Sequence, residues 1–187
     1  MMSVFKLHQA IALCHTLRER GHTPDSIVTL NRSELNPDTW SPMLADHKEA
    51  EIRLPISTLL SYTLRQSDNN ASNEMFVRLM SPAACDSVIA GIIQRGSFEI
   101  RFNEAEMQTD HSRAYSNRTS PLGAAILIDR LFTDTLVGKS YQDFIKSETR
   151  YSSLALFFPE RATKLFDTAE QQAKDRYAKL KKLADAE

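Results

Sequence analysis

Apolar side chains recur along this chain mostly at the spacing of an α-helix. Over residues 3–20 the apolar positions alternate steps of three and four, which places them on one helical face: Val4, Leu7, Ile11, Cys14 and Leu17. Gly21 and Pro24 follow this stretch and are residues that end helices. The pattern therefore predicts that the chain opens with a helix that buries one apolar stripe.

The middle of the chain carries two more helical stretches and one candidate strand. Residues 54–66 are predicted to form a helix with Pro55 in its first turn, where proline is tolerated. A polar run at 67–72 interrupts the pattern, and residues 73–80 resume it. Residues 27–30, Ile-Val-Thr-Leu, favour a short strand but have no evident partner.

Two later helices have clear start signals, and a polar segment separates them. Each begins with a serine that can cap a helix and a proline that suits its first position, at Ser81–Pro82 and at Ser120–Pro121. Residues 96–119 are mostly polar and lack helical periodicity, so we expect a long loop there. A loop of that length inside a compact domain is usually functional or disordered.

The C-terminal part carries a continuous apolar stripe from Ala162 to Ala184, which Pro159 and Glu160 open. It predicts one amphipathic helix. We therefore expect two units, a helical domain over residues 1–146 and an unrelated helical tail over residues 147–187. The fold class predicted from the whole pattern is mainly α.

Composition narrows the functional classes. The chain has 187 residues, a formal net charge of −1 and 42% hydrophobic residues, enough for a sizeable core. A near-neutral charge gives no electrostatic footprint for nucleic acid or an anionic membrane surface. No apolar run is long enough to span a bilayer. We therefore expect neither nucleic acid nor a membrane as a partner.

The cysteines and histidines do not suggest a metal centre. Cys14 and Cys85 lie in apolar helical contexts, which favours buried free thiols over a disulfide. There is no Cys-x-x-Cys pair, and the five histidines lack the spacing of metal ligands. The opening residues also lack the features of a signal peptide, so expression of the sequence as given would leave it in the cytoplasm.

Two short motifs carry candidate chemistry. Ser3 and Lys6 are one helical turn apart, which places a hydroxyl beside an amine, although a serine cap followed by a surface lysine has the same spacing. Ser67-Asp68-Asn69 lies at the break between two predicted helices, where such residues also form ordinary turns. Together the motifs match two parts of a known set, Ser-x-x-Lys with Ser-Asp-Asn.

Longer runs around these motifs give the chain a specific resemblance. "MMSVFKLHQAIALC", "TWSPML", "YTLRQSDNNASN" and "AYSNRTSPLGAAILIDRLF" resemble the class A serine β-lactamases, in the branch typified by the CfxA and PER enzymes. The resemblance covers residues 1–146. It implies the helical half of the β-lactamase/transpeptidase-like α/β fold, with most of the β-sheet missing and a C-terminal amphipathic helix added.

The resemblance implies catalytic roles for the two motifs. Ser3 resembles the nucleophile that attacks the lactam carbonyl, and Lys6 resembles its buried amine partner. Ser67 resembles the hydroxyl that passes a proton to the lactam nitrogen. Asn69 resembles the amide that binds the acylamino side chain of the substrate. Asp68 is expected to hold the loop through backbone bonds.

The resemblance also gives the long polar segment a purpose. Glu104 matches the carboxylate that activates the deacylating water, with Glu106 as a rival two residues later. Gln108 occupies a position that helps hold this water. Asn73 is similar to the amide that orients the glutamate, and Asn117 to an anchor at the end of the loop.

Other features set limits on that expectation. Trp40 matches an aromatic residue at the rim of the substrate cleft, with packing in the core as its alternative. The Lys-Thr-Gly motif that completes the family's set occurs nowhere in the sequence. Relatives also precede the serine with further segments, so we expect an internal piece of a larger enzyme. Without the sheet, an apolar face would be exposed and favour self-association.

The function implied is hydrolysis of β-lactam antibiotics without a cofactor, impaired by the missing Lys-Thr-Gly. The alternatives are a catalytically inactive helical remnant or a relative of the penicillin-binding peptidases. Members of the family are periplasmic or secreted.

Overall fold

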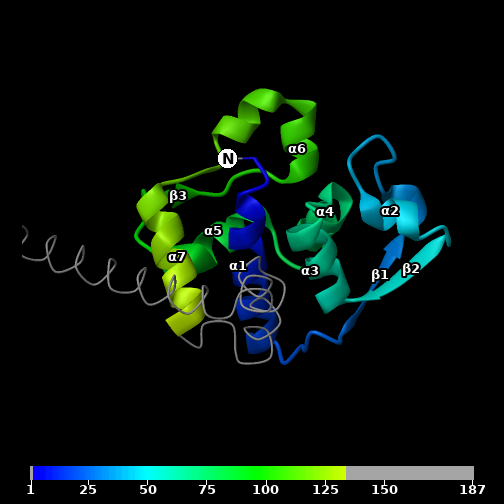
Figure 1. The fold of residues 1–187 in the computed structure, drawn as a ribbon, viewed down its shortest axis with the longest axis horizontal. Helices are drawn as coiled ribbons and strands as arrows, with labels where there is room; N and C mark the ends of the chain where they lie inside the picture. The colour runs from blue at the N-terminus through cyan, green and yellow to red at the C-terminus, as the bar shows by residue number, and fades with distance from the viewer. Residues whose placement is uncertain (1, 134–187) are drawn as a thin grey trace, which may run out of the picture. The chain divides into compact units, whose positions relative to one another are not determined.

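The computed structural model describes residues 2–133, which belong to the first of the two units into which the chain divides, Met1–Glu148 and Thr149–Glu187. The predicted tail helix lies outside the described residues. The described part is mainly α-helical, as predicted (Figure 1). Its elements in chain order are α1 (Phe5–Glu19), β1 (Ile27–Asn31), η1 (Arg32–Glu34), α2 (Pro42–Asp46), β2 (Glu51–Pro55), α3 (Ile56–Arg65), α4 (Asn69–Arg78), α5 (Pro82–Ala90), β3 (Phe98–Glu99), α6 (Glu104–Thr109), η2 (His111–Tyr115), β4 (Arg118–Thr119) and α7 (Pro121–Thr133).

Helix α1 lies at the centre of this unit (Figure 1). It packs against α3 and α5, and nearly all of its first ten residues are buried. The Phe5 ring stacks on the Phe76 ring of α4 with centroids 5.8 Å apart, which joins α1 to a third neighbour. Burial on several sides explains why polar side chains of α1 also have to find partners inside the protein.

The predicted strand at 27–30 has a partner that the sequence analysis missed. Strand β1 pairs with β2 in antiparallel register, with Thr29 opposite Arg53. Residues alternate between exposed and buried along both strands, so the ribbon covers one edge of the core. The predicted helix over 54–66 is shorter than expected, because Pro55 ends β2 and caps α3 instead of lying inside it.

Helix α4 begins earlier than predicted. The polar run at 67–72 interrupts the helices only as far as Asp68, because Asn69 is already the first residue of α4 and Asp68 caps it by accepting a hydrogen bond from Ala71 N at 2.8 Å. The serine caps of the two later helices are confirmed: Ser81 caps α5, and Ser120 Oγ accepts from the backbone N–H of Gly123 at the start of α7.

The segment at 96–119 contains short helices and strands, so the prediction of one long loop was wrong. Its two ends pair as β3 and β4, with Phe98 opposite Thr119. Between them lie α6 and η2. With 6 and 5 residues, these helices are too short to show a helical repeat of apolar positions. The pairing of β3 with β4 brings the two ends of the segment together, and helix α6 within the segment packs against α4.

Both cysteines are buried free thiols, as predicted. Burial raises the pKa of each thiol well above its ordinary value. Among the described residues, no helix is both long enough and apolar enough to cross a membrane.

Candidate active site

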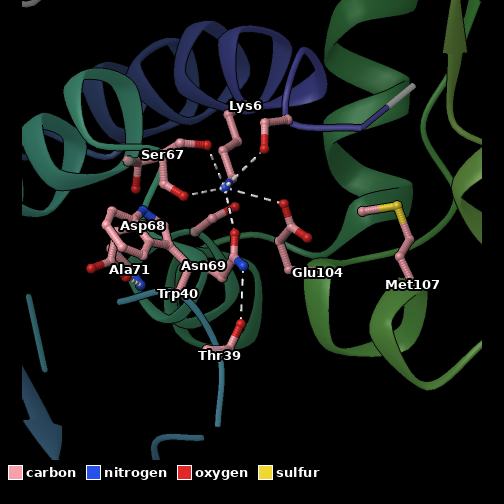
Figure 2. A network of polar contacts seen from close by, with 12 residues as sticks. Lys6, Thr39, Trp40, Ser67, Asp68, Asn69, Ala71, Glu104 and Met107 are labelled. Atoms are coloured by element: carbon pink, nitrogen blue, oxygen red, sulfur yellow. Dashed lines mark hydrogen bonds and ion pairs between the residues drawn. The ribbon is translucent and has the colours of Figure 1, made fainter. Parts of the chain in front are cut away.

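The amine of Lys6 lies at the centre of a cluster of oxygen atoms (Figure 2). Lys6 Nζ is 3.4 Å from Ser3 Oγ and 3.1 Å from Glu104 Oε1. It also lies 2.8 Å from the backbone oxygen of Ser67, 3.2 Å from Ser67 Oγ and 2.7 Å from Asn69 Oδ1. These contacts bring both sequence motifs and the predicted carboxylate to one atom.

Burial changes the chemistry of this amine. The Lys6 side chain is 3% exposed. Desolvation lowers its pKa below the ordinary value of 10.5, while Glu104 and, more weakly, Asp68 oppose that shift by stabilising the charged form. A buried lysine with a lowered pKa can take and return a proton more readily than a lysine in water.

Ser3 lies just before α1, in a turn where Phe5 N donates to Met2 O and Lys6 N donates to Ser3 O. The predicted helix over 3–20 therefore begins two residues later than expected, at Phe5. The turn before it still holds the Ser3 hydroxyl within 3.4 Å of the Lys6 amine. Ser3 is exposed and Lys6 is buried. A ligand can therefore reach Ser3 while the Lys6 amine stays shielded from water.

Ser67 has an unusual backbone conformation that serves the cluster. Its φ of 56° lies in the left-handed region, and among the described residues it is the one non-glycine residue with a positive φ. This conformation costs about 1 kcal/mol or more for an ordinary residue. It turns both the carbonyl and the hydroxyl of Ser67 toward Lys6 Nζ, and these two contacts offset the strain.

Asp68 stabilises the fold around the cluster, whereas Asn69 belongs to the cluster itself. Asp68 is fully buried, and its carboxylate accepts from Ser41 Oγ, Met43 N and Ala71 N, so it joins the starts of α2 and α4. Asn69 Oδ1 accepts from Lys6, and its Nδ2 donates to Thr39 Oγ1 at 2.9 Å. The amide of Asn69 is thereby held in one orientation.

The two candidate glutamates occupy different environments. Glu104, the first residue of α6, is 6% exposed and contacts Lys6. Glu106 accepts from Asn103 N while Asn103 Oδ1 accepts from Glu106 N, which is a reciprocal cap of α6. The Asn-x-x-Glu pattern at 103–106 is a local signal of this cap, and it could have set Glu106 aside from the sequence alone.

The remaining predicted residues lie around the cluster in different ways. Asn117 is fully buried and bonds the backbone at 101–102, accepting from Arg101 N and Phe102 N and donating to Phe102 O. Trp40 is 65% exposed, so core packing is excluded, and its Nε1 donates to Gln66 O beside Ser67.

Asn73 and Gln108 contact neither Glu104 nor Lys6 through a hydrogen bond in the described part of the chain. Asn73 Oδ1 is buried without a hydrogen-bond partner. Gln108 Nε2 donates to Thr39 Oγ1 at 2.7 Å. Thr39, which the sequence analysis did not single out, therefore accepts from both α6 and Asn69. A threonine in a turn-rich loop carries no signal of such a role.

No group of three or more His, Cys, Asp or Glu side chains within residues 2–133 is arranged to hold a metal ion. The described chemistry is thus that of hydroxyl, amine, amide and carboxylate groups around one buried lysine.

This fold and this cluster have counterparts among known proteins. The structure matches the crystal structure of a β-lactamase from Chitinophaga pinensis with a TM-score of 0.74 and 30% identity, covering 79% of this chain and 54% of that one. Class A β-lactamase structures match it over about the same share of the chain. The chain therefore shares the fold of about half of a class A β-lactamase.

Sequence comparison also matches the chain to β-lactamases. The model of the family described as "Beta-lactamase enzyme family" matches residues 1–162. A β-lactamase of Phocaeicola vulgatus is 54% identical over 147 residues, which are 79% of this chain and 46% of that protein. The extended-spectrum β-lactamase PER-1 of Pseudomonas aeruginosa is 30% identical over 142 residues, with 76% and 46% covered.

The chain belongs to the β-lactamase enzyme family. It spans about half the length of the curated relatives that it matches.

Proposed function

We propose that this chain carries serine β-lactamase machinery of the class A type, with Ser3 as the nucleophile and β-lactam antibiotics as the substrates. The observation that carries the proposal is the position of Lys6 Nζ within hydrogen-bond distance of Ser3 Oγ, Ser67 Oγ and Glu104 Oε1. The names of the two relatives, a β-lactamase and an extended-spectrum β-lactamase, support the substrate class.

In acylation, Ser3 Oγ attacks the lactam carbonyl carbon, forming an ester and breaking the carbon–nitrogen bond of the ring. The Ser3 proton passes to the neutral amine of Lys6, and Lys6 returns a proton through Ser67 Oγ to the departing nitrogen. The lowered pKa of Lys6 supports its role as the proton acceptor. Asn69 and Ser67 both contact Lys6 Nζ, and the exposed Trp40 bonds Gln66 O next to Ser67, so we expect the side chain of a bound lactam to contact Asn69 and Trp40.

In deacylation, a water attacks the ester carbonyl and transfers a proton to Glu104. The ester bond then breaks, and Glu104 gives that proton up so that the Ser3 oxygen is protonated again. A general base has to lie within one water of the reacting carbonyl. Glu104 shares Lys6 Nζ with Ser3, which supports that placement. A dedicated deacylating carboxylate favours a hydrolase over a penicillin-binding peptidase, which needs no such group.

Turnover by the chain as given is expected to be impaired. In the family, the Lys-Thr-Gly strand supplies an oxyanion-hole donor and a clamp for the substrate carboxylate, and this sequence contains no Lys-Thr-Gly. Loss of one oxyanion donor alone costs roughly 10² to 10³ in rate. We expect no hydrolysis of a chromogenic cephalosporin above buffer. Hydrolysis that disappears in Ser3→Ala would overturn this part of the proposal and establish a fully competent enzyme.

The catalytic roles are tested in a chimera that joins this chain to the parts of the Phocaeicola vulgatus relative that it does not match. We expect the chimera to hydrolyse penicillins, and Ser3→Ala to abolish the activity. In Glu104→Gln, acylation should proceed and release should stall, leaving a persistent adduct on Ser3 by mass spectrometry. Glu106→Gln is the matched control and should release product. No adduct on Ser3 in either variant would refute the proposal and favour an inactive helical remnant.

A further inference from the structure

Helices α1 and α4 are joined by two successive polar contacts. In the first, Lys6 Nζ donates to Asn69 Oδ1 at 2.7 Å. In the second, Gln9 Nε2 donates to the backbone oxygen of Ser72 at 2.8 Å, and Ser72 Oγ donates to Gln9 Oε1 at 2.7 Å. Gln9 follows Lys6 by three positions and Ser72 follows Asn69 by three, so the second contact lies one turn along both helices.

The second contact is completely enclosed. Gln9 and Ser72 are both 0% exposed, and the stacked rings of Phe5 and Phe76 join the same two helices. A buried amide or hydroxyl without a partner costs about 1–3 kcal/mol, so the two side chains have to keep each other as partners. Because the Gln9 amide both donates to Ser72 and accepts from it, sliding one helix along the other would break both bonds.

The two contacts respond differently to protonation. The contact from Lys6 changes when the amine loses its proton, because one donor and the positive charge disappear together. The contact between Gln9 and Ser72 is made by neutral groups and stays the same at every pH at which the protein folds. It can therefore hold the helices while the charge on Lys6 changes.

We propose that Gln9 and Ser72 are positioning residues, a neutral pair that keeps α1 and α4 in register so that Lys6 Nζ stays among Ser3, Ser67, Asn69 and Glu104 in both of its charge states. The catalytic importance of that position rests on the proposed function. The positioning of Lys6 does not, because it concerns the free protein.

Loss of the pair has a definite electrostatic consequence. The charged groups that act on Lys6 are Glu104, at the start of α6, and Asp68, at the start of α4, and both favour its protonated form. Desolvation is the larger effect and disfavours that form. If α1 and α4 loosen, water reaches Nζ and the pKa of Lys6 rises toward its ordinary value.

The test is a pH titration of Lys6 in the full chain by heteronuclear NMR of its Cε and Nζ, assigned by the absence of the signal in Lys6→Arg. We expect Ser72→Ala and Gln9→Leu each to raise the pKa of Lys6. Ser72→Thr keeps the hydroxyl and should retain the wild-type titration. Thr63→Val is the matched control, because it removes a buried hydroxyl that bonds Leu59 O inside α3, and it should leave Lys6 unchanged.

A Lys6 titration in Ser72→Ala that coincides with wild type would overturn the proposal, whatever the loss in thermal midpoint. If Ser72→Ala does not fold, Ser72→Cys keeps the size of the side chain with a weaker donor, and the same criterion applies to it. The titration uses no substrate. Failure of the chimera to acylate Ser3 would therefore refute the proposed function alone, and an unchanged titration beside an acylating chimera would refute the positioning pair alone.

Discussion

Two segments that flank Lys6 are fastened to the protein by different chemistry. The first wall, residues 36–41 together with 67–69, is held by the carboxylate of Asp68. The second wall, residues 101–119, is held at its base by the amide of Asn117. Both anchoring side chains are completely buried, yet one carries a charge and the other does not.

The difference follows from what each anchor has to satisfy. Asp68 faces only donors, the Ser41 hydroxyl and the backbone N–H groups of Met43 and Ala71 at two helix starts. A carboxylate only accepts, and its negative charge suits the partial positive charge at helix N-termini. Asn117 has to accept from two backbone N–H groups and also donate to a carbonyl, which an amide can do and a carboxylate cannot.

Substitution of Asp68 in the first wall is therefore expected to lower the free energy of unfolding more than any other change proposed for the two walls. Asp68→Ala leaves several buried donors without an acceptor, and charge-assisted bonds are the strong ones. We expect the free energy of unfolding to fall by about 3–5 kcal/mol, measured by urea denaturation followed by circular dichroism. Asp68→Asn keeps one acceptor oxygen and should lose less. A loss below about 1 kcal/mol in Asp68→Ala would contradict the comparison.

The second wall is expected to loosen in acid through His8 of α1. His8 is 0% exposed, its Nε2 lies 3.3 Å from Thr119 Oγ1 of β4, and burial lowers its pKa from 6.5 to about 4. Below pH 6.5 the unfolded chain takes up this proton before the folded one does. Stability attributable to His8 should therefore fall by about 3 kcal/mol between pH 6.5 and 4, at 1.36 kcal/mol per pKa unit.

Urea denaturation of wild type and His8→Gln across this pH range isolates that contribution, since other groups titrate equally in both proteins. The difference in unfolding free energy between the two should shrink as the pH falls from 6.5 to 4. A difference that is independent of pH would show that His8 is protonated alike in both states.

Asn117→Ala should cost less than Asp68→Ala because the lost bonds are neutral. We expect about 2 kcal/mol of destabilisation, with faster hydrogen exchange at the amides of Arg101 and Phe102, which bond Asn117 Oδ1. Asn117→Asp retains that oxygen and should protect these two amides better. If exchange accelerates equally throughout residues 2–133, the anchor acts on the whole unit and the second wall has no separate fastening.

The smallest effect is expected where the two walls meet. Gln108 Nε2 donates to Thr39 Oγ1, and Gln108 is exposed. A neutral, solvent-accessible bond contributes about 0.5–1 kcal/mol at most, so Gln108→Ala should change the unfolding free energy by less than about 1 kcal/mol. Gln108→Glu is the control that keeps the length of the side chain but removes the donor. A larger loss would mean that the walls depend on each other.

The sequence predicted those parts of the fold whose signals are local. The capped starts of α5 and α7 were predicted because a serine followed by proline acts within one turn. The pairing of β1 with β2 was not predicted, because Thr29 and Arg53 are far apart in the chain. Neither strand carries a local signal that identifies its partner. The start of α4 was placed late because Ser67-Asp68-Asn69 resembles a turn until Asp68 is seen to cap the helix.

For the site, the motifs in the sequence determined which residue types are present and, through the resemblance, the family. Which of them meet was decided by tertiary packing. The ammonium of Lys6 reaches the carbonyl of Ser67, and Gln9 finds Ser72, only because α1 and α4 are buried against each other. Burial also lowers the pKa of Lys6, and no local pattern encodes it, since desolvation depends on every neighbour that excludes water from one atom.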